Sequence, residues 1–442
     1  MKKLLIVTIL SIGGLFISCS SNESEDNTPK TPVILPPSAI SISSVSSELV
    51  FTGDLLEILG TDFINKDYPT KIFINDVEVS PKDLANTKIQ ILITDALKAG
   101  VNTLKLQIDK VSSKPISFFI MAKGWNKLNA FGDKDVITSC VFDESKTIFS
   151  LVDDDVATNV FNGTPKKLEG KSMGLKEVYI NHSGNYGHFK MIDEKIGVLT
   201  NTVQAFYTDN SYETNKKTDN VTLSFNPVIN GLKIGYLDNK SSIVTTSVGG
   251  QLYTDNNGAT IVKNDPPNWA IKTDNQSVTT RIGIEAFGKS TSNDKFYELG
   301  VLFATNKDGS INYKNLVLES ETGYSNWVVK DSVSIVDSNR GYKFLNINKI
   351  LAIKATDKTL QESNDMLKTW KTIKTDVTSI FLRTETKWYI QSGDKLFVTT
   401  DAGQTWNLEL ELPVGSIVND ISFSKSKIIV SGNKGLHYLK IE

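Results

Sequence analysis

The chain has 442 residues, of which 39% are hydrophobic, and this is enough to bury sizeable cores in more than one domain. Its 48 basic and 50 acidic side chains leave a formal net charge of −2, and this balance gives no electrostatic footprint for nucleic-acid binding. The 45 Lys against three Arg (Arg281, Arg340 and Arg383) also argue against dedicated phosphate recognition, because that task favours the bidentate Arg side chain.

The N-terminus reads "MKKLLIVTILSIGGLFISC", with two Lys followed by an apolar run that ends at Cys19. This pattern predicts a secretory signal over residues 1–18, since the run is shorter than the about 20 residues of a membrane span. The ending "FISC" resembles the processing box of bacterial lipoproteins. The resemblance implies that Cys19 is lipidated and anchors the mature chain to the membrane.

Residues 19–38 are polar, acidic and rich in Pro, so they are predicted to be a disordered tether. The stretch "SNESED" resembles the surface-export signals of Bacteroidota lipoproteins, which implies the outer membrane and the cell surface. The other thiol, Cys140, lies in the apolar run "VITSCVF" and is predicted to be a small buried side chain.

Residues 39–121 contain short runs of alternating apolar residues, which predict β-strands. The segment "GDLLEILGTDF", followed by "KIFINDVEVS", resembles the IPT/TIG module, an immunoglobulin-like (Ig-like) β-sandwich. In this interpretation Gly53 and Gly60 provide turn dihedrals, and one core is shared by four side chains: Leu56, Ile58, Phe73 and Ile91.

Residues 122–442 contain a repeated pattern, seen best in "TTDAGQTW" near the C-terminus. Its key positions are Thr399, Asp401, Gly403, Thr405 and Trp406 in one copy, and Ser363, Asp365, Thr369 and Trp370 in a second. Looser copies cover Thr254–Ile261 and Glu319–Trp327. The pattern resembles the Asp-box, or BNR, repeat of sialidase-like β-propellers, which implies repeated four-stranded blades. Its polar side chains are predicted to stabilise tight hairpin turns. The resemblance implies that these turns lie between the third and fourth strands, on the face away from the ligand.

Fourth strands of these blades are predicted near residues 165, 215, 268, 326, 369 and 405. After the last one, three strand-like runs remain, and "GWNKLN" (124–129) would complete their sheet from the other end of the chain. The predicted fold is therefore all-β, with an Ig-like sandwich and a seven-bladed propeller; six and eight blades are the alternatives.

Candidate ligand-binding residues lie in predicted loops on the opposite end of the blades. The loop 169–188 carries Tyr179, His182, Tyr186 and His188, while Arg281 opens one innermost strand and Arg340 precedes another. Calcium at Asp153, Asp154 and Asp155 is an alternative to a solvated turn, and no other cofactor or metal site is predicted. No catalytic residue is assigned, because Arg383 is expected at the far end of its strand and the three Arg cannot form a sialidase carboxylate clamp.

These observations favour a surface-anchored, non-catalytic lipoprotein that binds an extracellular glycan or protein ligand, with its lipid in the outer membrane. Two alternatives stay open: an exo-acting glycan hydrolase or lyase, and a scaffold for an envelope complex.

Overall fold

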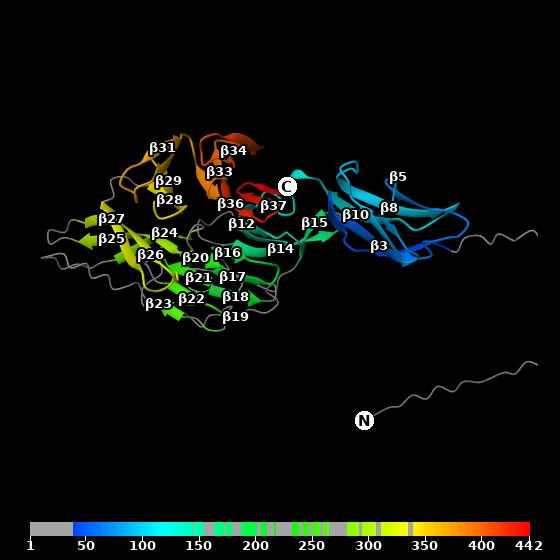
Figure 1. Cartoon of the computed structure of the whole chain (residues 1–442), viewed down its shortest axis with the longest axis horizontal. Helices are drawn as coiled ribbons and strands as arrows, with labels where there is room; N and C mark the ends of the chain where they lie inside the picture. Colours follow the sequence, from blue (N-terminus) through cyan, green and yellow to red (C-terminus); the bar gives the residue numbers. More distant parts are fainter. Residues whose placement is uncertain are drawn as a thin grey trace, which may run out of the picture.

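The protein is all-β, with strands β1 to β38 along the chain (Figure 1). The computed structural model describes residues 39–143, 145–153, 163–171, 174–178, 187–200, 205–209, 216–217, 232–237, 242–246, 251–256, 260, 262–264, 281–290, 294–305, 311–334 and 339–442. In this part of the chain, no helix has the length and apolar character of a membrane crossing.

The first two sheets come from residues 41–121 (Figure 1, blue and cyan). One sheet has the order β1 (Ser41–Val45), β3 (Leu55–Thr61), β7 (Lys88–Leu92) and β6 (Asp83–Leu84). The other has the order β2 (Leu49–Phe51), β10 (Ile116–Met121), β8 (Gly100–Ile108), β4 (Thr70–Ile74) and β5 (Val77–Val79), with β9 (Val111–Ser112) paired to β8. The pair β2–β10 is parallel, and the other pairs are antiparallel.

The two sheets share one apolar core, because alternate residues of each strand point to the same face. Leu56, Ile58 and Ile91 lie in this core as expected. Phe73 does not: Ile72 and Ile74 are its buried neighbours, and Phe73 is half-buried on the other face beneath Lys105.

The two predicted turn glycines have different roles. Gly53 has a φ of 98°, the left-handed region that suits a turn. Gly60 lies inside β3, where a Cβ atom would come within 2.0 Å of the Ser41 carbonyl oxygen. Gly60 is therefore needed for close approach between strands and not for a turn.

Seven four-stranded antiparallel sheets follow in the described residues. The first four are β12 (Asp135–Val141), β13 (Ile148–Asp153), β14 (Gly163–Lys171) and β15 (Gly174–Val178); β16 (His188–Met191), β17 (Ile196–Thr200), β18 (Ala205–Asp209) and β19 (Lys216–Lys217); β20 (Leu232–Leu237), β21 (Ser242–Thr246), β22 (Gln251–Thr254) and β23 (Val262–Asn264); and β24 (Arg281–Lys289), β25 (Phe296–Thr305), β26 (Ile311–Ser320) and β27 (Val328–Ser334). The next two are β28 (Asn339–Phe344), β29 (Ile350–Lys354), β30 (Thr359–Ser363) and β31 (Lys371–Lys374); and β32 (Ser379–Leu382), β33 (Trp388–Ser392), β34 (Lys395–Thr399) and β35 (Asn407–Glu411).

The last sheet joins the two ends of this region. Its order is β11 (Gly124–Lys127), β38 (His437–Ile441), β37 (Lys427–Gly432) and β36 (Val418–Phe423). Trp125 lies opposite Lys440 in the antiparallel register of β11 and β38. The pairing expected for "GWNKLN" is thus confirmed.

The sheets follow one another in a closed circle. Each first strand contacts the next in the order β12, β16, β20, β24, β28, β32 and β36, and β36 contacts β12. Figure 1 shows the C-terminal strands beside β12. Such a ring of meandering sheets is consistent with a β-propeller.

Two expected fourth strands lie elsewhere. The run at residue 165 belongs to β14, the third strand of its sheet, and β15 is the fourth. This strand falls inside the predicted loop 169–188. The fourth strand expected at 268 lies outside the described residues, and β23 occupies that position in the sheet. Short polar strands such as β15 and β23 carry too weak an alternation to be recognised.

The first two sheets pack directly against the ring. Leu49, Phe51 and Met121 share an apolar cluster with residues of the first and last sheets, among them Val141 and Ile429. The packing is close, because a Cβ atom on Gly170 of β14 would lie 2.8 Å from the Leu49 Cβ.

Candidate functional site

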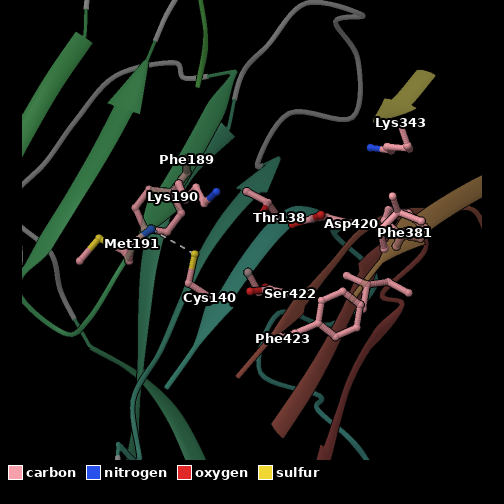
Figure 2. A pocket seen from close by; sticks show the side chains of 13 residues that line it. Thr138, Cys140, Phe189, Lys190, Met191, Lys343, Phe381, Asp420, Ser422 and Phe423 are labelled. Atoms are coloured by element: carbon pink, nitrogen blue, oxygen red, sulfur yellow. Dashed lines mark hydrogen bonds between the residues drawn. The ribbon is translucent and has the colours of Figure 1, made fainter. Parts of the chain in front are cut away.

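A cavity of about 460 Å³ lies where the first strands meet (Figure 2). Its lining residues come from five of these strands: β12, β16, β28, β32 and β36. The volume falls within the range of small-molecule sites, so the hub of the ring is the candidate site.

Three polar residues reach this cavity immediately after a β-bulge in their own strand. The strand register shifts between Val136 and Thr138 in β12, between Arg340 and Lys343 in β28, and between Val418 and Asp420 in β36. A bulge adds one unpaired residue and re-aims the side chains that follow it. Thr138, Lys343 and Asp420 each follow the shift and each line the cavity.

Thr138 and Asp420 form a hydrogen-bonded pair on one wall. The Thr138 hydroxyl donates to Asp420 Oδ2 at 2.5 Å, and Figure 2 shows the two side chains meeting from neighbouring strands. Burial raises the pKa of Asp420, and the Thr138 hydrogen bond and the charges of Lys343 and Lys190 oppose that shift. The cavity therefore favours the protonated carboxyl more than water does.

Lys343 projects into the cavity from β28 (Figure 2). Burial lowers the pKa of its amine, and attraction to Asp420 works in the opposite direction. Both groups are thus shifted towards their neutral forms, in which each can donate and accept hydrogen bonds.

The rest of the lining combines apolar side chains, among them Phe189, Phe381 and Phe423, with the polar residues Ser139, Lys190 and Ser422. Cys140 is buried beside Met191, whose backbone N–H donates to its sulfur at 3.3 Å. Burial raises the pKa of the Cys140 thiol to about 12, so the thiol stays protonated and is not a nucleophile.

The loop residues expected to bind ligand are only partly visible. Tyr179, His182, Tyr186, Asp154 and Asp155 lie outside the described residues. Asp153 ends β13, and His188 opens β16, two residues before the cavity-lining Lys190. Arg281 opens β24, and Arg340 is the second residue of β28 rather than preceding that strand, but the structure does not describe their side chains.

The two best Asp-box copies form hydrogen-bonded turns between a third and a fourth strand. Asp401 Oδ1 accepts from the Thr405 N–H at 2.9 Å, and Asp401 Oδ2 accepts from the Thr405 hydroxyl at 2.6 Å. Thr399 Oγ1 accepts from the Gly403 N–H at 2.9 Å. Asp365 makes the same pair of hydrogen bonds with Thr369.

These turns lie at the opposite end of the sheets from the starts of the first strands, because third and first strands run in the same direction. Trp406 closes its turn by donating from Nε1 to the Gly403 carbonyl at 3.1 Å. Trp370 packs 6.3 Å from the Tyr342 ring. Hydrogen bonds to Thr405 and Thr399 lower the pKa of Asp401 to about 2, so its charge stabilises the turn.

Arg383 follows β32, and the structure describes its partners. Its guanidinium donates to Glu442 at 2.5 Å and to the carbonyl oxygens of Ser424 and Lys425. Arg383 therefore ties the C-terminus to a neighbouring turn.

No protein-family model matches this chain, and no curated protein matches it significantly. Solved structures that are similar include YCF48 bound to D1 peptide (14% identity, 72% of this chain and 97% of that chain, TM-score 0.49) and YCF48 from Cyanidioschyzon merolae (11%, 72% and 98%, TM-score 0.49). Another is an auxiliary nutrient binding protein from Bacteroides ovatus ATCC 8483 (9%, 92% and 98%, TM-score 0.34). At these identities and TM-scores the likenesses carry no argument about function.

Proposed function

We propose that this chain is a lipoprotein that binds an extracellular glycan or protein ligand without transforming it. In this proposal Cys19 carries the lipid, residues 19–38 are the tether, and the anchor lies in the outer membrane with the protein at the cell surface. Residues 39–121 act as an Ig-like module of the IPT/TIG kind. Residues 122–442 act as a seven-bladed propeller that presents its hub to the ligand.

The observation that supports binding is the hub cavity, where bulges in three separate sheets direct Thr138, Lys343 and Asp420 to one place. Polar side chains directed into a cavity fix the orientation of a ligand. Fully apolar side chains would close the hub at lower cost, because buried polar groups lose their hydration.

One observation favours a glycan hydrolase as the second candidate. Asp420 is a carboxyl group with a raised pKa inside a cavity, as a general acid requires. Most glycosidases need a second carboxyl group across the bond that is cleaved. Asp420 is the one carboxyl group among the described residues that line this cavity, so binding is the better-supported function.

The test uses the chain from residue 19 with Cys19→Ser, which is made without lipid. It is incubated with polysaccharides and with proteins from an outer cell surface, and both retention and product formation are measured. Retention without chemical change supports the proposal. Release of sugar products that requires Asp420 would replace it with the hydrolase.

A further inference from the structure

We infer that the hub cavity is a site for one uncharged sugar unit, recognised by the hydroxyl, carboxyl and amine groups of Thr138, Asp420 and Lys343 beside the half-buried ring of Phe381. This inference rests on the proposed binding function and adds to it the place and the class of ligand.

The arrangement of charges favours an uncharged ligand. Lys343 and Asp420 carry opposite charges when ionised, and Lys190 also lines the cavity. A ligand with a net charge would meet one group of the same sign at short range, which disfavours it. Burial raises the pKa of Asp420 and lowers the pKa of Lys343, so the charged form of each group is disfavoured in the cavity relative to water.

Hydrogen bonding favours a ligand rich in hydroxyl groups. The Thr138 hydroxyl donates its hydrogen to Asp420 Oδ2, so the Thr138 oxygen can still accept a hydrogen bond from a ligand. The other carboxyl oxygen of Asp420 can also bond to the ligand. Ser422 adds a further hydroxyl from the same strand as Asp420. Sugar hydroxyls both donate and accept, so they match groups that can do the same.

The apolar part of the lining suits the C–H face of a sugar ring. Phe381 and Phe423 line the cavity from β32 and β36 and are half-buried, and the Phe423 ring also contacts Tyr389 and Arg383. Phe189 of β16 also lines the cavity, but it is 5% exposed and packs on Phe149, so it offers no ring face to a ligand. A ring stacked on an aromatic side chain, with its hydroxyls directed to polar groups, uses both parts of the lining.

The probes are neutral monosaccharides and disaccharides: glucose, galactose, mannose, xylose, cellobiose and lactose. Glucuronate and glucosamine serve as charged counterparts. Binding is measured by calorimetry on the unlipidated chain from residue 19 and on two cavity variants, Asp420→Asn and Lys343→Met. Asp255→Asn and Lys395→Met are matched controls, because both side chains are exposed and outside the cavity.

The expected result is binding of at least one neutral sugar, about tenfold weaker in each cavity variant and unchanged in each control. The charged counterpart of that sugar should bind more weakly to the parent. Circular dichroism and the melting temperature show that each variant is folded. Asp420→Asn keeps an oxygen that accepts the Thr138 hydrogen bond, so this cavity variant is expected to fold.

Two results would overturn the inference while leaving the proposed function intact. One is neutral-sugar binding that neither cavity variant weakens, which would put the site elsewhere. The other is a chain that retains a surface polymer or protein but binds no neutral sugar, or binds only a charged one through the cavity. A chain that retains no ligand of any class would overturn the proposed function as well.

Discussion

The ammonium group of Lys427 lies 4.8 Å from the centre of the Phe51 ring. This contact connects β37, in the last sheet of the ring, to the first two sheets. The same ammonium donates to the carbonyl oxygens of Phe142, Asp143 and Ser145, at 2.6 to 2.7 Å. Lys427 is only 4% exposed. The buried Lys427 side chain thus connects the last sheet, the turn after β12 and the first two sheets.

Replacement of this lysine should destabilise the protein. In Lys427→Met the apolar stem is kept, but three carbonyl oxygens lose a charged donor, and the Phe51 ring keeps the cation–π contact with Lys146 but loses the one with Lys427. We expect the free energy of unfolding in urea to fall by about 3 kcal/mol. Lys425→Met is the matched control, since Lys425 is exposed on the same turn. Equal stability of the two variants would refute this role.

Acid should weaken the ring at its last sheet. His437 is 1% exposed, lies 3.1 Å from the Ser139 hydroxyl and stacks on Phe131. Burial lowers its pKa from 6.5 to about 3. Between pH 6.5 and about pH 3, His437 is protonated in the unfolded chain but neutral in the folded one. The free energy of unfolding therefore falls as the pH falls through this range, by up to about 1.4 kcal/mol per pH unit.

The His437→Gln variant tests this assignment, because its amide can still meet Ser139 but does not titrate. Urea unfolding at pH 7, 5.5 and 4 should show a shallower loss of stability in the variant than in the parent. Parallel pH profiles for the two chains would mean that other groups control the acid response.

The Asp-box copies should matter for stability and not for ligand binding. Asp401→Ala removes the acceptor of two hydrogen bonds from Thr405, so we expect a melting temperature lower by a few degrees. Gln404→Ala, in the same turn and exposed, should change it little. Ligand retention by folded Asp401→Ala should equal that of the parent, and a loss of retention without a loss of stability would assign the box a binding role.

The parts of the fold that local pattern controls could be predicted from the sequence. The Asp-box turn depends on residues within eight positions of one another, and the pairing of β11 with β38 follows from counting strands in a closed sheet. Phe73 was placed on the wrong face, because both faces of β4 carry large apolar residues and the period of two does not choose between them.

The hub site could not be predicted in the same way. Thr138, Lys343 and Asp420 stand in three strands far apart in the chain, and each reaches the cavity because of a bulge. Bulges leave little trace in a single sequence, although Gly341, with a φ of 66° inside the β28 irregularity, is one sign. A charged residue inside a first strand, such as Asp420 in β36, was the other available signal.

The last sheet combines β11 from the start of residues 122–442 with β36, β37 and β38 from their end, so each end needs the other to complete this sheet. Trp125 Nε1 donates to Glu409 Oε1 at 3.1 Å, and Lys440 donates to the same oxygen while lying over the Trp125 ring. Deleting residues 432–442 removes β38, which is the strand between β11 and β37. Two strand edges would then be exposed at once, and β11 would lose its partner.

We therefore expect both the deletion and Trp125→Ala to make the ring sensitive to protease, while the first two sheets stay protected by their own core. Trp406→Ala is the control for the loss of a tryptophan, because Trp406 closes its turn and packs on the neighbouring β31 but takes no part in joining the chain ends. Limited proteolysis followed by mass spectrometry identifies the surviving fragments. A dispensable tail would fray only within its own residues. If the truncated chain keeps a compact fragment that begins near residue 130, the pairing of the two ends does not hold the ring together.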